Sequence, residues 1–269
     1  MKNATRKTRI SAISTILTQS PNKLYSLSFF SEMFGSSKST LSEDVAIIKE
    51  SFDTYKLGKI EVVMGAAGGV RFLPDTSEKE REMILGEIAQ RLQNPNRVLP
   101  GGFIYTADIL MDPMYVDKMA LILWNGFRKS NPDFIITVEA KGIPLAMSVA
   151  RLFQKPLIVA RRESKLTEGS VVTINYLSGV SGRMQKMSIS KRSVREGQKA
   201  LIIDDFIAGG GTIRAVCEIM KEFSITVVGS GAAISTRVPE KKKIDHYKSI
   251  FVLEKVDEEK KTISISVNC

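Results

Sequence analysis

The stretch KALIIDDFIAGGGTI, residues 199–213, decides the fold of this chain. Its apolar run, residues 200–203, is short and rich in branched side chains, as is typical of a buried strand in a parallel sheet. Asp204 and Asp205 follow at the point where we expect this strand to leave the core. Small residues, 208–211, then form a turn ahead of an apolar-periodic segment. The pattern therefore predicts a strand, a glycine-rich turn and a helix in succession.

This succession predicts a site for a ribose 5-phosphate. Glycine lets backbone N–H groups approach a ligand closely, and a helix N-terminus offers unpaired donors and positive dipole. The acidic pair suits ribose hydroxyls, or a divalent ion such as Mg²⁺ that accompanies a polyphosphate. A dinucleotide motif is excluded because Arg214 takes its last glycine position, and no P-loop Gly-Lys-Ser/Thr occurs. A glycine-rich turn alone would favour a generic strand-to-helix connection, but the whole pattern is much more specific.

Composition bounds the class of protein. With 269 residues, 43% of them hydrophobic, the chain can hold one large domain or one medium and one small domain. Only Cys217 and Cys269 are present, so we expect no disulfide framework, no metal site and a reducing cytoplasm. Neither an apolar signal core nor a membrane-length apolar span occurs, so we expect a soluble protein without a membrane partner. The net charge of +10 favours polyanionic partners.

The N-terminal residues 1–74 have the pattern of three helices followed by a β-hairpin. Apolar residues recur at helical spacing in three short segments, and two β-like runs flank a glycine-rich tip. The predicted elements are three helices and two strands, near residues 10–20, 26–34, 36–52, 60–64 and 70–73. This order predicts a winged helix-turn-helix domain.

Basic and hydroxyl side chains in this domain favour double-stranded DNA as its partner. Ten Lys and Arg residues stand against six Asp and Glu residues in 1–74, a net charge of +4. The start of the third helix, residues 37–42, offers hydroxyls and one Lys, which suit phosphates and base edges. The alternative is a winged helix that docks a protein. The residues predicted to contact DNA are Arg6, Lys7, Arg9, Lys38, Ser39, Thr40, Ser42 and Arg71.

Strands and helices alternate in the second domain, residues 75–269. A charged amphipathic helix is predicted at 77–93, and Asp112-Pro113 is a good start for a helix that ends near Phe127. Further predicted elements are strands at 134–138, 157–159 and 201–204 and a helix at 143–153. This alternation predicts an α/β fold, with a mainly parallel sheet, helices on its faces and ligands at the carboxyl ends of its strands.

Two more segments of this domain suit anions. Residues 139–144, EAKGIP, can present backbone amides and the charge of Lys141, although strand–glycine–helix turns are common. Residues 161–195 form a long basic segment with a tip at 178–182. Lys165 enters it, and the return carries Arg183, Lys186, Lys191, Arg192 and Arg195. A loop that closes over a bound anion and a solvated basic hairpin are both compatible with this pattern.

Two family resemblances rest on these motifs. IIDDFIAGGGT resembles the phosphoribosyl pyrophosphate motif of type I phosphoribosyltransferases. The whole chain resembles the purine operon regulators of Gram-positive bacteria, through KSTLSED, GAAGGVRFLP, NPNRVLPGG, KGIPLA, KLTEGS and INYLSG. That family joins a winged-helix DNA-binding domain to a type I phosphoribosyltransferase-like domain, usually as a homodimer. The resemblance implies operator DNA as partner, and its members include repressors and activators.

The resemblance further implies that phosphoribosyl pyrophosphate is an effector rather than a substrate, with Mg²⁺ as its expected companion. The implied effector-binding residues are Asp204, Asp205, Phe206, Ala208, Gly209, Gly210, Gly211, Thr212, Ala140, Lys141, Gly142 and Arg161. Two alternatives stay open: a working purine phosphoribosyltransferase, and a sensor that binds a guanine nucleotide alarmone in the same pocket. Against the enzyme, residues 208–210 carry no acid or base for a purine proton, so no catalytic residue is assigned.

Overall fold

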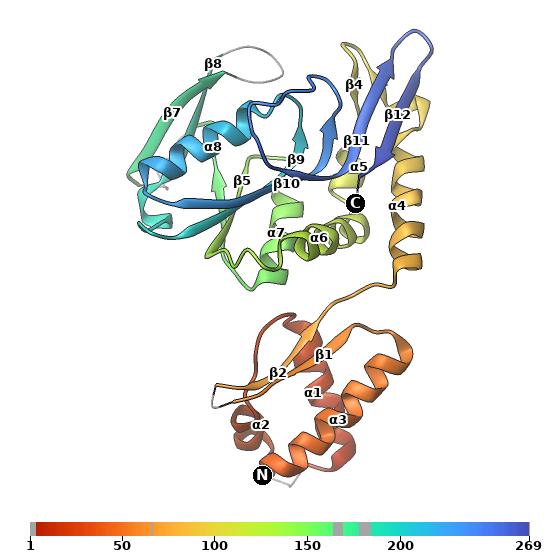
Figure 1. Ribbon diagram of the computed structural model, residues 1–269, viewed down its shortest axis with the longest axis vertical. Coiled ribbons are helices and arrows are strands. Elements are labelled where there is room, and N and C mark those ends of the chain that lie inside the picture. The colour runs from red at the N-terminus through yellow and green to blue at the C-terminus, as the bar shows by residue number, and fades with distance from the viewer. Residues whose placement is uncertain (1–3, 66, 164–168, 178–183, 269) are drawn as a thin grey trace. The chain divides into compact units, whose positions relative to one another are not determined.

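The computed structural model describes residues 4–65, 67–163, 169–177 and 184–268 (Figure 1). The chain divides into two compact units, Met1–Arg81 and Glu82–Cys269. The predicted domain boundary, after residue 74, precedes this division, which falls within α4 (Glu78–Leu92). The tip predicted at residues 178–182 lies outside the described residues, as do Lys165 and Arg183.

Three helices and a β-hairpin form the N-terminal unit, which confirms the predicted element order. The elements are α1 (Arg6–Gln19), α2 (Leu27–Phe34), α3 (Lys38–Tyr55), β1 (Lys59–Val63) and β2 (Gly69–Leu73). Each helix starts after a hydroxyl residue, Thr5, Ser26 or Ser37, whose side chain accepts a hydrogen bond from a first-turn N–H. Local capping therefore sets the helix starts.

The core of this unit joins all of its elements. Ile13 and Leu17 of α1, Phe30 of α2 and Leu41 of α3 are fully buried, and Ile60 of β1 packs into the same cluster. These are the residues that the helical and alternating patterns place on the inward faces.

A six-stranded sheet organises the C-terminal unit (Figure 1). Its order is β12-β11-β10-β9-β5-β6, and every pair is parallel except β11–β12. The strands are β5 (Phe134–Val138), β6 (Leu157–Ala160), β9 (Lys199–Ile207), β10 (Thr226–Thr236), β11 (Lys248–Asp257) and β12 (Thr262–Val267). The predicted mainly parallel sheet is confirmed.

Both faces of this sheet are covered (Figure 1). On one face, α8 (Gly211–Glu222) and the hairpin of β7 (Val171–Leu177) and β8 (Met184–Ser190) share a buried cluster with alternate residues of β5 and β9. On the other, α6 (Pro113–Phe127) packs against β10 and β11, and α7 (Ile143–Phe153) against β5 and β9. The carboxyl ends of β5 and β9 therefore lie side by side between the two layers.

Two local predictions differ from the structure. The strand predicted to end at Asp204 continues to Ile207, because β10 pairs alongside it as far as Ser235. Prolines and glycines in residues 94–102, NPNRVLPGG, predict an irregular connection. The structure has a short 3₁₀ turn there and the first strand of a small hairpin, β3 (Val98–Leu99) with β4 (Phe103–Ile104). The short helix α5 (Ala107–Leu110) follows this hairpin. In the described part of the chain, no helix has the length and apolarity needed to span a bilayer.

Candidate functional site

A cavity of about 700 Å³ lies at the carboxyl ends of β5 and β9. It gathers the glycine-rich turn, the acidic pair and the loop after β5, as expected for an α/β sheet. Its lining consists of Phe103, Val138, Glu139, Ala140, Lys141, Arg162, Gln185 and residues 204–213. Nearly all predicted effector-binding residues are thus brought together.

The glycine-rich turn is held in shape from behind. Gly210 has φ +77°, the left-handed conformation that suits glycine, and it precedes the first residue of α8. The Lys243 N–H donates to the Gly209 carbonyl at 2.9 Å, so this carbonyl is satisfied away from the cavity. The first N–H groups of α8 have no partner inside the helix and are free to bind an anion. Thr212, half-buried in this first turn, adds a hydroxyl.

The acidic pair has two unlike members. Asp204 is 6% exposed, whereas Asp205 is half-buried. Burial raises the pKa of Asp204 well above its usual range, the charge of Asp205 raises it further, and Arg162 opposes the rise. The Asp205 N–H donates to Asp204 Oδ1 at 2.9 Å, which orients the buried carboxyl. The pair therefore offers one half-buried carboxyl, that of Asp205, and one buried carboxyl, that of Asp204, which favours its proton.

The loop after β5 closes directly over Asp204. A Cβ at Gly142 would lie 2.7 Å from Asp204 Oδ1 and even closer to Thr137 Oγ1. Thr137 is fully buried, and among the described residues its hydroxyl has no hydrogen-bond partner. Gly142 is therefore required here for close packing, while Ala140 and Lys141 stay exposed along the cavity.

Arg161, a predicted effector-binding residue, is not among the residues that line the cavity. Arg161 Nη1 donates to Glu139 Oε2 at 3.3 Å, and Arg161 exchanges backbone hydrogen bonds with Ser188 of β8. The next residue, Arg162, lines the cavity instead, and its N–H donates to Glu139 Oε1 at 2.8 Å. Successive residues in an extended chain point to opposite sides, and the sequence prediction named Arg161, whereas Arg162 is the neighbour that lines the cavity.

Sequence reasoning also missed Phe103 and Gln185. Phe103, 51% exposed, reaches the cavity from the β3–β4 hairpin, and Gln185 reaches it from β8. An aromatic residue after a Gly-Gly pair and a glutamine in an alternating strand were the available signals. Neither is specific without the tertiary structure.

In the N-terminal unit, four predicted DNA-binding residues cluster at the start of α3. Lys38, Ser39 and Ser42 are exposed, and Thr40 is half-buried. The Ser37 hydroxyl hydrogen-bonds to those of Ser39 and Thr40 at 2.8 and 2.9 Å. Lys38 and Ser42 also line a groove of about 450 Å³ together with residues of the β1–β2 hairpin. This arrangement suits a duplex whose phosphates and base edges meet the helix start.

The predicted basic residues outside α3 have different surroundings. Lys7 and Arg6 are exposed on α1, although Arg6 Nε also lies 3.4 Å from Asp44 Oδ1. Arg9 is only 8% exposed and donates to Asp44 Oδ2 at 2.7 Å, so its charge faces inward. Arg71 pairs with Glu61 across the hairpin. Lys7 fits a phosphate contact, whereas Arg6, Arg9 and Arg71 have acidic partners within the unit.

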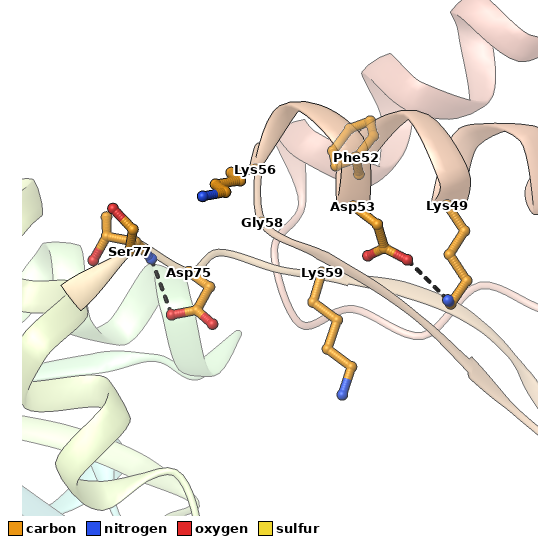
Figure 2. A pocket seen from close by; sticks show the side chains of 9 residues that line it. Lys49, Phe52, Asp53, Lys56, Gly58, Lys59, Asp75 and Ser77 are labelled. Carbon is orange, nitrogen blue, oxygen red and sulfur yellow. Dashed lines mark hydrogen bonds and ion pairs between the residues drawn. The ribbon is translucent and has the colours of Figure 1, made fainter. Parts of the chain in front are cut away.

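A further cavity of about 430 Å³ lies at the other end of α3 (Figure 2). The Lys49–Asp53 ion pair, 2.9 Å, and a hydrogen bond from Thr76 N to Asp75 Oδ1 border it. It contains none of the predicted DNA-binding residues. Within the described ranges, no group of three or more His, Cys, Asp or Glu residues could hold a metal ion.

Both units match known domain families in the same order. Residues 5–74 match the family described as bacterial purine repressor, N-terminal, and residues 107–268 match the phosphoribosyl transferase domain. The purine biosynthesis transcriptional repressor PurR of Bacillus subtilis is 39% identical over 260 residues, 97% of this chain and 91% of the relative. The purine biosynthesis transcriptional activator PurR of Lactococcus lactis is 35% identical over 262 residues, 97% of each chain. The two names differ in the sign of regulation.

Solved structures support the fold of the C-terminal unit. Adenine phosphoribosyltransferase from Rhodothermus marinus superimposes with a TM-score of 0.53 at 19% identity, over 62% of this chain and 97% of that chain. The enzyme from Saccharomyces cerevisiae gives 0.51 at 22% identity, over 61% and 97%. Because the relatives of 35% and 39% identity span almost the whole chain and both domain families match in order, the chain belongs to the PurR family of bacterial purine regulators.

Proposed function

We propose that this regulator binds operator DNA through its N-terminal unit and senses phosphoribosyl pyrophosphate in the cavity of its C-terminal unit. The observation that carries the proposal is the cavity, which combines a helix N-terminus, an acidic pair and a second loop with basic side chains. Each part suits one part of the ligand. The turn at 208–212 suits the 5-phosphate, Asp205 and Asp204 suit ribose hydroxyls, and residues 140–142 with Arg162 suit the pyrophosphate.

Magnesium fits this proposal as a companion of the ligand. Mg²⁺ is commonly bound through one or two carboxylates together with ligand phosphates and water. The adjacent carboxyls of Asp204 and Asp205 line the cavity and would supply such ligands. The ion would reduce the repulsion between the acidic pair and a polyphosphate.

The sensing proposal predicts loss of ligand binding when both acids are neutralised. The double variant Asp204→Asn/Asp205→Asn keeps the side-chain volumes but replaces both carboxyl groups with neutral amides. We expect no measurable phosphoribosyl pyrophosphate binding by calorimetry, and DNA binding that no longer responds to the ligand. The matched control is Glu258→Gln/Glu259→Gln, an adjacent exposed pair outside the cavity, which should bind normally. Unchanged binding by the Asn variant would refute the site.

A stability measurement separates loss of the site from loss of the fold. Because the pKa of Asp204 is raised in the folded protein, this carboxyl opposes folding increasingly as the pH rises through that pKa. Asn at this position removes the ionisation. The variant should therefore be at least as stable as the natural protein at neutral pH, even though it does not bind the ligand.

The proposed role is sensing rather than catalysis. Ala208, Gly209 and Gly210 present no acid or base to a purine ring nitrogen. Incubation with phosphoribosyl pyrophosphate and adenine, guanine, hypoxanthine, xanthine or uracil is therefore expected to yield no nucleotide above background, as measured by chromatography. Rapid formation of any product would favour the transferase alternative.

A guanine nucleotide alarmone is a second candidate ligand, favoured by Phe103. This half-exposed ring lines a cavity that otherwise suits ribose and phosphates, and aromatic rings stack on nucleobases. Phosphoribosyl pyrophosphate has no base to use it. A displacement titration of one ligand against the other tests whether both occupy this cavity.

A further inference from the structure

Gln185 interrupts the core-facing stripe of the β7–β8 hairpin. Residues two apart on a strand share a face, so Gln185 lies on the same face of β8 as Met187 and Ile189, which are 0% and 1% exposed. Lys186, which is exposed, belongs to the opposite face. A polar amide therefore stands where the stripe passes from the core to the effector cavity.

Tyr176 determines how this amide is presented. Tyr176 and Gln185 are directly opposite in the β7–β8 ladder, and the Tyr176 hydroxyl donates to Gln185 Oε1 at 2.8 Å. Tyr176 is only 6% exposed and belongs to the buried cluster beneath α8, so its position is restrained by packing. Because Gln185 Oε1 accepts this hydrogen bond, the Nε2 group of Gln185 is the part of the amide left to bind a molecule in the cavity. Among the described residues it has no acceptor.

Unpaired amide donors suit an acceptor that the protein itself does not provide. The cavity also contains the donors of the 208–212 turn and the cations Lys141 and Arg162, all of which suit phosphate oxygens. We propose that Gln185 donates from Nε2 to a phosphate group of the bound effector, and that Tyr176 is its positioning residue. This inference rests on the proposed function and adds a contact to the effector from the β7–β8 hairpin.

The test measures ligand affinity by calorimetry on the full chain. Gln185→Met removes the donors at similar length, and Gln185→Glu keeps the acceptor for Tyr176 but turns a negative charge toward the phosphates. Because hydrogen bonds to charged groups are the stronger class, we expect affinity for phosphoribosyl pyrophosphate to fall about 10-fold for Met and about 100-fold for Glu. Gln198→Glu is the matched control, since Gln198 Oε1 accepts from Arg195 N outside the cavity.

Titrations with ribose 5-phosphate and inorganic pyrophosphate identify the phosphate concerned. A loss shared with ribose 5-phosphate assigns Gln185 to the 5-phosphate, and a loss shared with pyrophosphate assigns it to the other end of the ligand. Either result supports the proposal. If the natural protein binds the ligand and both Gln185 variants bind it within twofold, the assignment is overturned and the sensing function stands. If the natural protein binds none of the three ligands, both the Gln185 assignment and the sensing function are overturned.

A double-mutant cycle tests the positioning role of Tyr176. Tyr176→Phe leaves the ring in the core but frees the amide to rotate, so affinity should fall about threefold when Gln185 is present. The same change should have no effect on affinity when position 185 is Met. A purely structural role of Tyr176 would instead produce equal losses in both backgrounds.

Discussion

Replacing Asp44 with Ala is expected to lower the free energy of unfolding of the N-terminal unit by about 3–5 kcal/mol. Asp44 is 0% exposed and accepts from Arg9 Nε at 2.7 Å, while Arg6 Nε lies at ion-pair distance without hydrogen-bond alignment. Without this carboxylate, Arg9 keeps its charge in a buried site, with the Ala4 carbonyl as its remaining acceptor. Since α1 and α3 are joined by this pair, DNA binding should be lost with the fold.

Urea unfolding, followed by far-UV circular dichroism, measures this effect. Trp124, the chain's only tryptophan, lies in α6, so its fluorescence reports the C-terminal unit and should be unchanged. Glu43→Ala is the matched control, because the Glu43 side chain is 70% exposed and its 3.7 Å contact with Arg6 should contribute less than about 1 kcal/mol.

The pair of substitutions Arg9→Met/Asp44→Leu gives an independent check. Removing both charges together leaves no unpaired ion, so most of the stability should return. A change of less than about 1 kcal/mol for Asp44→Ala alone would contradict the role assigned to this buried pair.

Adding one methyl group at Gly142 is expected to weaken binding of phosphoribosyl pyrophosphate by about 10- to 100-fold. The new Cβ would lie 2.7 Å from Asp204 Oδ1 and 3.3 Å from Asp204 Cα, with Thr137 Oγ1 closer still. Both neighbours are buried and fixed in strands, so either the loop after β5 or the acidic pair must shift. Either shift displaces protein atoms that we propose to bind the effector.

This effect is steric rather than conformational. Gly142 has φ −71° and ψ −18°, a backbone conformation that alanine adopts readily. Calorimetry on Gly142→Ala measures the affinity, with Gly86→Ala in α4 as matched control because nothing lies within 4 Å of its added Cβ. Gly86→Ala should bind normally and be slightly more stable, since alanine favours helices. Normal affinity of Gly142→Ala would contradict this prediction, because it would show that the loop accommodates the added methyl group without disturbing the effector site.

Much of the fold could be predicted because the relevant signals are local. Periodicity and capping act over one or two helical turns, and α6 begins and ends where Asp112-Pro113 and Phe127 predict. The stretch 199–213 contains a whole strand, turn and helix start, so its glycine-rich turn needed no distant residue to be recognised. The predicted end of β9 was wrong because the length of this strand depends on pairing with β10, a segment that lies elsewhere in the sequence.

The sequence by itself determined the order of elements, the glycine-rich turn and the acidic pair, since neighbouring residues specify each of them. Only the tertiary structure decided which charges meet. In the sequence, Arg9 and Lys7 are both basic residues of the same predicted helix, but in the structure Arg9 pairs with Asp44, 35 positions along the chain. Likewise, Arg161 pairs with Glu139 while Arg162 lines the cavity. A charge is buried only where folding brings a distant partner to it, because an unpaired ion in the core costs more free energy than packing returns.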